Sequence, residues 1–260
     1  MHIIDIHAHV YPHKVAVKAS TNIGNFYSIN MNYDGTTECL LKAGGADRFV
    51  IHSVATSPAQ VQPINDFIAE EVQAHPDRFI GFASLHPDME NPGAELERAL
   101  KMGLKGVKLH PDFQRFRTDS PEAIRLFQVC AENGAPVLMH TGDVRHNYSR
   151  PWMVPPVLDA CKGKLKLVCA HFGGWSEWMV AARVLKGMDI WVDTASSSFA
   201  LSENQLRYLI GVYGEDRVIF GSDYPMWDPG EEAKTFQALG LGREAEEKIF
   251  HRNLEKLLNL

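Results

Sequence analysis

The stretch Ile4-Asp5-Ile6-His7-Ala8-His9-Val10, near the start of the chain, shows a strict alternation of apolar and polar residues. An alternation of period two predicts a β-strand with one apolar and one polar face. The apolar face suits packing against a layer of helices. We therefore expect Asp5, His7 and His9 to point away from that layer, toward the inside of the sheet.

Further short apolar runs recur along the chain, and each is followed by a segment with helical periodicity. Nearly continuous apolar runs are typical of parallel strands that are covered on both faces. No GxGxxG motif or P-loop follows the first strand, so a closed α/β barrel, the (β/α)8 TIM barrel, is favoured over an open nucleotide-binding sheet. The eight predicted strands are residues 2–9, 48–55, 78–85, 104–110, 135–141, 165–172, 188–194 and 217–222.

Helix signals lie between the predicted strands. Residues 63–74 carry an apolar stripe, Ser120-Pro121 has the pattern of a helix start, and Ser202 with Gln205 has the spacing of a capping box. Residues 243–260 form a last amphipathic segment, which we expect to pack across the outside as an extra C-terminal helix. We expect residues 1–260 to form a single domain.

The composition narrows the classes of function. The net charge is −6 and the basic residues are scattered, so the chain lacks the basic surface that nucleic-acid binding requires. No apolar run approaches the roughly 18 residues of a membrane span, and the first residues do not resemble a signal peptide. The four cysteines show no CxxC spacing, which favours buried free thiols. We expect a cytoplasmic protein that acts on a small molecule.

Several metal-binding residue types fall at the ends of the predicted strands. His140, His171 and Asp223 close the fifth, sixth and eighth strands, and His7 and His9 close the first. In a barrel the carboxyl ends of the strands meet at one face, where active sites are assembled. Imidazole and carboxylate groups suit zinc or a similar first-row ion. The alternative, a set of separately hydrogen-bonded histidines, explains their common position less well.

This pattern resembles the amidohydrolase superfamily, and three local sequences resemble its amidohydrolase-related branch. The similarity spans the chain from Asp5 to Asn253. The three sequences are Gly106-Val107-Lys108-Leu109-His110-Pro111, Ala170-His171-Phe172-Gly173-Gly174 and Gly221-Ser222-Asp223-Tyr224-Pro225.

The resemblance implies one divalent metal, zinc in the first place and manganese as the alternative. The implied ligands are His7, His9, His140 and Asp223, with His171 beside the water that the metal activates. Enzymes resembling this branch are commonly homodimers. The sequence itself has no feature that specifies a dimer.

The resemblance implies hydrolysis of an amide, ester or lactone bond in a small, anionic substrate by that activated water. Asp223 would take the proton of the water and pass it to the leaving group, and His171 would stabilise the oxyanion or share the acid–base work. The branch also includes non-oxidative decarboxylases similar to aminocarboxymuconate-semialdehyde decarboxylase. A metal-dependent decarboxylase or hydratase of a small carboxylic acid is therefore the alternative. A non-catalytic metal-binding barrel is the second alternative.

Three further residues are candidates for binding the substrate: His110, Lys108 and Arg145. Lys108 also matches the lysine that is carbamylated and bridges two metals in dihydroorotase-like relatives, and a buried lysine paired with Asp5 is a third interpretation. A nuclease resembling the TatD type is disfavoured, because that group has a carboxylate where this chain has Lys108.

Other residues are expected to have ordinary structural roles. We expect His52 to be a hydrogen-bonded core residue rather than a ligand, and we expect Trp175 to belong to the core. Asp193 closes the seventh strand and is expected to orient either a loop or a histidine. The segment of residues 11–35, which includes Tyr27, is a candidate wall of the pocket.

Overall fold

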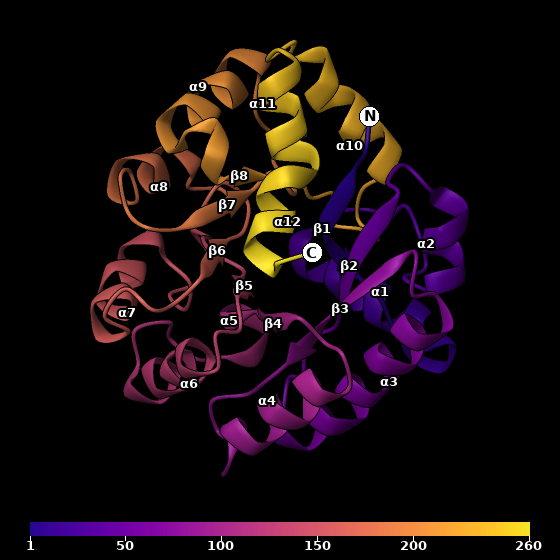
Figure 1. The fold of residues 1–260 in the computed structure, drawn as a ribbon, viewed down its shortest axis with the longest axis vertical. Helices are drawn as coiled ribbons and strands as arrows, with labels where there is room; N and C mark the ends of the chain where they lie inside the picture. Colours follow the sequence, from indigo (N-terminus) through magenta and orange to yellow (C-terminus); the bar gives the residue numbers. More distant parts are fainter.

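The computed structural model describes residues 1–260, and at its centre lies one sheet of eight parallel strands, paired in chain order (Figure 1). The predicted (β/α)8 TIM barrel and all eight predicted strands are confirmed, although every strand is shorter than expected at one or both ends. The strands are β1 (Ile4–His9), β2 (Arg48–His52), β3 (Phe79–Ser84), β4 (Gly106–Leu109), β5 (Val137–Met139), β6 (Leu167–Cys169), β7 (Trp191–Asp193) and β8 (Val218–Ile219).

The last strand meets the first, which closes the barrel. The backbone N–H of Ile6 donates to the carbonyl of Phe220 at 3.0 Å. Beyond the end of β8, the N–H of Asp223 donates to the carbonyl of His7 at 2.9 Å. The chain that follows β8 is therefore held against β1, which brings Asp223 beside the two histidines of β1.

Helices surround the strands as an outer ring (Figure 1). Ser120 and Ser202 cap their helices as predicted, and Ser202 forms the full capping box with Gln205. The helices are α1 (His13–Tyr27), α2 (Thr37–Ala43), α3 (Val61–Ala74), α4 (Pro92–Lys101), α5 (Pro111–Gln114), α6 (Pro121–Glu132), α7 (Val154–Ala160), α8 (Trp178–Val184), α9 (Glu203–Tyr213), α10 (Pro229–Ala238), α11 (Arg243–Glu247) and α12 (Asn253–Leu258).

The first strand departs from the predicted alternation. Ala8 packs with the outer layer, as expected, but Ile4 and Ile6 belong to a separate cluster inside the barrel. The pairing of β1 with β2 shifts register between Asp5 and Ala8, which is a β-bulge or a similar irregularity. An extra residue at that point changes which face each side chain takes. The prediction that Ile4 and Ile6 face the helix layer is therefore wrong.

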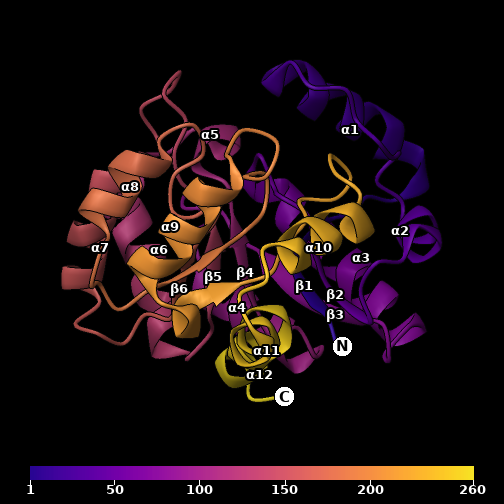
Figure 2. The same cartoon turned by 90° about the horizontal axis from the view of Figure 1, so that it is seen from above.

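The C-terminal segment is helical, as predicted, but it covers one end of the barrel instead of its outer side. A π-helical turn, Lys248–Arg252, joins α11 to α12. Leu254 and Leu257 of α12 pack with Ile4 and Ile6 inside the barrel. In Figure 1 α12 lies over the centre of the barrel, and Figure 2 shows α1 at the opposite end. The helix α12 therefore forms the floor of the barrel.

Two smaller expectations concern membranes and thiols. None of the helices combines the length and the apolar character needed to cross a membrane. All four cysteines are free, and Cys130, Cys161 and Cys169 are buried. Burial raises the pKa of the Cys130 thiol to about 12, which keeps this thiol protonated and unreactive at neutral pH.

The floor of the barrel gives a test of stability. Leu257 is 2% exposed and packs inside the barrel, whereas Leu260 is 49% exposed at the end of the same segment. We predict that Leu257→Ala lowers the free energy of unfolding by about 2–5 kcal/mol, because a buried leucine is replaced by a cavity. Leu260→Ala is the matched control and should change it by less than about 0.5 kcal/mol. Urea denaturation measures both, and equal effects would contradict the packing of α12.

Candidate metal centre

A small cavity opens at the carboxyl ends of the strands. Its polar lining includes five of the residues singled out from the sequence as a candidate metal site. The complete lining is His7, His9, Ile23, Tyr27, Met31, His110, Phe113, His140, His171, Trp175, Ser196, Asp223, Pro225 and Met226.

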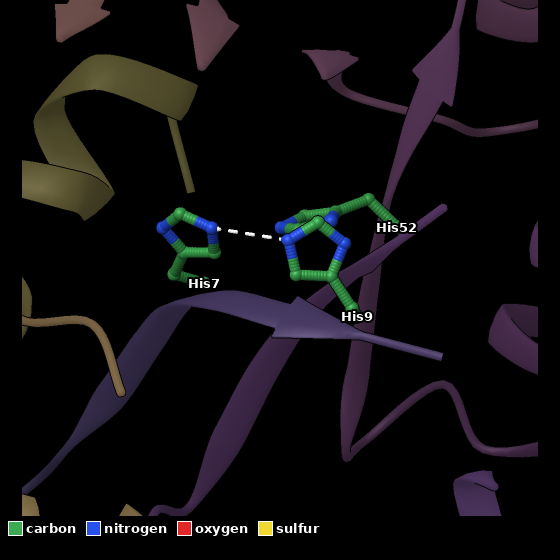
Figure 3. A group of neighbouring side chains, drawn as sticks. All are labelled: His7, His9 and His52. Atoms are coloured by element: carbon green, nitrogen blue, oxygen red, sulfur yellow. Dashed lines mark hydrogen bonds between the residues drawn. The ribbon is translucent and has the colours of Figure 1, made fainter. Parts of the chain in front are cut away.

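The two histidines of β1 and Asp223 direct their polar atoms toward one point. His7 Nε2 lies 3.3 Å from His9 Nε2 (Figure 3). Asp223 Oδ1 lies 3.3 Å from His7 Nε2 and 3.6 Å from His9 Nε2. Nitrogens about 2.1 Å from one shared zinc ion would lie roughly 3.4 Å apart in a tetrahedral site. The spacing of these three groups therefore fits a common metal ion.

The hydrogen bonds around the histidines fix which ring nitrogen carries the proton. His7 Nδ1 donates to Asp193 Oδ2 at 2.7 Å, which leaves the lone pair on Nε2. His171 Nδ1 donates to the carbonyl of Ala195 at 2.9 Å, which leaves the lone pair on its Nε2. Such partners of the second nitrogen are typical of metal-binding histidines. Asp193 therefore orients a histidine, one of the two roles expected from the sequence.

His140 presents the same arrangement from β5. Its Nε2 donates to the carbonyl of Gly142 at 3.1 Å, and its Nδ1 lies 3.0 Å from His171 Nε2. With both protons committed elsewhere, two lone pairs face each other across this short distance. A cation between them would turn this repulsion into attraction. The donor set therefore fits a metal ion, which would be held at this end of the barrel.

The electrostatics keep these rings unprotonated. Burial, and next the positive charge of Lys108, hold the pKa of His7 well below its usual range. The same two causes act on His9. For His140 the causes are burial, then His171, then Lys108. Neutral imidazoles keep the lone pairs that a metal ion needs.

Two of the site residues have an unusual backbone. His171 and Asp223 lie in the left-handed region, at φ 61° and 68°. This conformation costs about 1–3 kcal/mol in a residue other than glycine and is often found at functional sites. The N–H of His171 donates to Asp193 Oδ1 at 2.6 Å, and the hydroxyl of Ser196 donates to Asp223 Oδ2. The first bond holds the backbone of His171, and the second holds the side chain of Asp223.

Lys108 contacts His7 through its side-chain amine. Its side chain is fully buried, and Nζ lies 2.7 Å from His7 Nε2. Burial lowers the pKa of Lys108 to about 8, while Asp223 and Asp193 act in the opposite direction. The amine is not part of the cavity lining, and it donates to the same lone pair on His7 Nε2 that a bound metal would take. It therefore acts on the site through His7 and through its charge.

The other two residues predicted to bind substrate differ in position. His110 lines the cavity, stacks on His140 with ring centroids 4.0 Å apart, and lies 3.0 Å from the hydroxyl of Tyr27 through Nε2. Arg145 does not line it. Its guanidinium pairs with Asp143 and donates to the carbonyl of Phe26 at 2.7 Å. The structure therefore brings His110 into the site and leaves Arg145 behind its wall.

Some residues of the cavity were not recognised from the sequence. Trp175 lines the cavity, so its expected core role is incomplete. Tyr27 lines it as well, which agrees with the predicted wall at residues 11–35, but that segment contains a helix, α1. His52 is buried beside His7 and His9, and neither ring nitrogen has a hydrogen-bond partner. His52 is therefore buried, as predicted, but the predicted hydrogen bond of its ring is absent.

Comparison with known proteins adds several likenesses. A 2-amino-3-carboxymuconate-6-semialdehyde decarboxylase from Dictyostelium discoideum is 27% identical over 205 residues, which cover 63% of this chain and 56% of that protein. The chain thus matches little more than half of this relative's length.

Two solved structures share the fold along the whole chain. A 5-carboxyvanillate decarboxylase from Sphingomonas paucimobilis superposes with a TM-score of 0.78 at 16% identity and covers 100% of this chain and 99% of its own. A dihydroxybenzoic acid decarboxylase from Polaromonas, solved with manganese and the inhibitor 2-nitroresorcinol, has a TM-score of 0.75 at 16% identity, with 100% and 97% covered. At this identity the likeness is one of fold.

The sequence pattern of one protein family covers nearly all of the chain. This pattern, described as amidohydrolase, matches residues 4–260. The match includes all eight strands and every residue of the candidate metal centre. The chain therefore belongs to the amidohydrolase family.

Proposed function

We propose that this protein is a metal-dependent decarboxylase, which removes carbon dioxide from a small carboxylic acid without an oxidant. The observation that carries the proposal is the convergence of donor atoms from His7, His9 and Asp223 in a cavity with aromatic walls. The names of the Dictyostelium relative and of the two structural neighbours support decarboxylation over hydrolysis.

We assign four residues as metal ligands: His7, His9, His140 and Asp223. Neutral imidazoles with one carboxylate suit manganese as well as zinc, and the Polaromonas neighbour contains manganese. When bound, a divalent ion polarises a substrate oxygen and stabilises the negative charge that develops on it. Elemental analysis distinguishes the two metals.

Loss of carbon dioxide breaks a carbon–carbon bond, and the electron pair of that bond stays on the substrate carbon. This carbon must then take a proton from the protein. Asp223 is our candidate donor, because Ser196 donates to its Oδ2 and Trp227 Nε1 donates to Ser196 Oγ at 2.8 Å, which fixes the carboxyl group. His171, whose Nε2 faces the site, is the second candidate for acid–base work.

The walls of the cavity suit a flat, unsaturated acid. His110 is stacked between Phe113 and His140, with ring centroids 3.8 Å and 4.0 Å away. Tyr27 contacts Trp175 edge to face, with centroids 4.9 Å apart. These packed rings exclude water and present planar surfaces to the substrate. The buried charge of Lys108 adds an attraction for anions.

Hydrolysis of an amide, ester or lactone remains the second candidate function, because the family is described as amidohydrolase. The same side chains serve both reactions, and a shared fold does not decide the chemistry. The two reactions differ in their products, since only decarboxylation releases carbon dioxide. An assay that measures carbon dioxide and hydrolysis products together therefore distinguishes the two reactions.

Asp223 provides the first test. We predict that Asp223→Asn lowers the rate of carbon dioxide release from 2,6-dihydroxybenzoate, 5-carboxyvanillate or 2-amino-3-carboxymuconate-6-semialdehyde about 10²–10⁴-fold, because proton transfer is lost. Asp189→Asn is the control, since Asp189 is exposed and pairs with Arg217. Unchanged turnover in Asp223→Asn would refute the assignment of Asp223. Hydrolysis products without carbon dioxide would favour the second function.

Metal content provides the second test. We expect protein purified without added metal to hold about one equivalent of zinc or manganese by elemental analysis, and the double variant His7→Ala, His9→Ala to hold none. Chelation should abolish turnover and one equivalent of metal should restore it. Two equivalents would instead support a carbamylated Lys108 that bridges two ions. Turnover that persists in fully metal-free protein would contradict the proposal.

A further inference from the structure

His52 is a buried polar side chain that the proposed mechanism does not use. It ends β2 and is 0% exposed, and neither Nδ1 nor Nε2 has a hydrogen-bond partner. Buried polar groups in folded proteins are nearly always paired, because an unpaired one loses its bonds to water without compensation. An imidazole in this state is explained if a ligand completes its bonding.

The strand register places His52 next to the β1 pair. His9 and His52 are paired residues on neighbouring parallel strands, so their side chains project from the same face of the sheet. The two ring centroids are 4.5 Å apart, and the planes are perpendicular at 89°. Figure 3 shows the ring of His52 close behind that of His9.

The ring of His7 also lies close to those of His9 and His52. Its ring centroid lies 5.3 Å from that of His52, and one nitrogen from each of His7, His9 and His52 lies within 4.8 Å of the others. His140 is not grouped with His7 and His9 in this way and lies instead with His110 and Asp112. His171 is grouped with His7 and Asp223 but not with His9, so the imidazole that is grouped with both histidines of β1 is His52.

We propose that His52 is a ligand of the divalent metal, binding it beside His7 and His9. This inference rests on the proposed function, because it requires that the site hold a metal. The imidazole of His52 supplies a ring nitrogen that is not hydrogen-bonded to any other residue. With His140 and Asp223 it would bring the protein ligands to five, which exceeds the four of a tetrahedral zinc site and suits an ion that takes six, such as manganese.

The alternative is that His52 is an unpaired core residue without contact to the metal. The two explanations make opposite predictions for His52→Leu, which keeps an apolar side chain of similar size. If His52 is only packing, leucine removes an unpaired polar group and leaves the affinity for metal unchanged. If His52 is a ligand, leucine weakens metal binding, whatever its effect on the stability of the metal-free protein.

The test uses the full chain, stripped of metal and titrated with cobalt(II) against a chelating dye, with the visible absorption spectrum recorded. We expect His52→Leu to bind cobalt at least tenfold more weakly than wild type and to show a changed spectrum. His86→Leu is the matched control, because His86 is buried just beyond β3 but does not lie in any group of side chains that could share a metal ion. It should retain the affinity and the spectrum of wild type.

Each outcome has a definite meaning. Wild-type affinity and spectrum in His52→Leu would overturn the role of His52 while leaving the metal site intact. Failure of the wild-type chain to bind cobalt would instead refute the metal-dependent function itself. If His52→Leu does not fold by circular dichroism, His52→Gln carries the test, because glutamine keeps a polar group but is a poorer ligand than imidazole. Unchanged binding in that variant would equally overturn the inference.

Discussion

Both sides of the candidate site depend on one buried carboxylate, that of Asp193 at the end of β7. One of its oxygens accepts the proton of His7 Nδ1 at 2.7 Å, and the other accepts the backbone N–H of His171 at 2.6 Å. The first bond decides which nitrogen of His7 faces the cavity, and the second holds His171 in its left-handed backbone conformation. A single side chain thereby orients the proposed metal ligand His7 and the proposed acid–base group His171 at once.

Much of this arrangement could be predicted from the sequence, because barrel enzymes place their reactive groups at strand ends. His7, His9, His140, His171 and Asp223 each end or follow a strand, and the structure gathers all five around one cavity. The strands themselves are short apolar runs with clear boundaries. The residue types at the strand ends and the order of the strands along the chain were therefore sufficient to predict the fold and the position of the candidate site.

The positions of other side chains could not be predicted, because they depend on contacts that sequence spacing does not encode. A register shift inside β1 turns Ile6 into the barrel, although simple alternation places it outside. His52 lies beside His7 and His9 because β2 pairs with β1 in a particular register, which is known only once the strands are aligned. Arg145 pairs with Asp143, two residues away, and with the carbonyl of Phe26, 119 residues away, and so is removed from the cavity.

The floor formed by α12 has a consequence for how the chain folds. The cluster inside the barrel unites Ile4 and Ile6, near the N-terminus, with Leu254 and Leu257, near the C-terminus. Contacts between such distant parts of a chain form late, because a large loop must close first. During synthesis the interior of the barrel stays unsealed until α12 has left the ribosome. Until then its apolar lining is exposed to other proteins, so this fold is expected to depend on rapid completion or on chaperones.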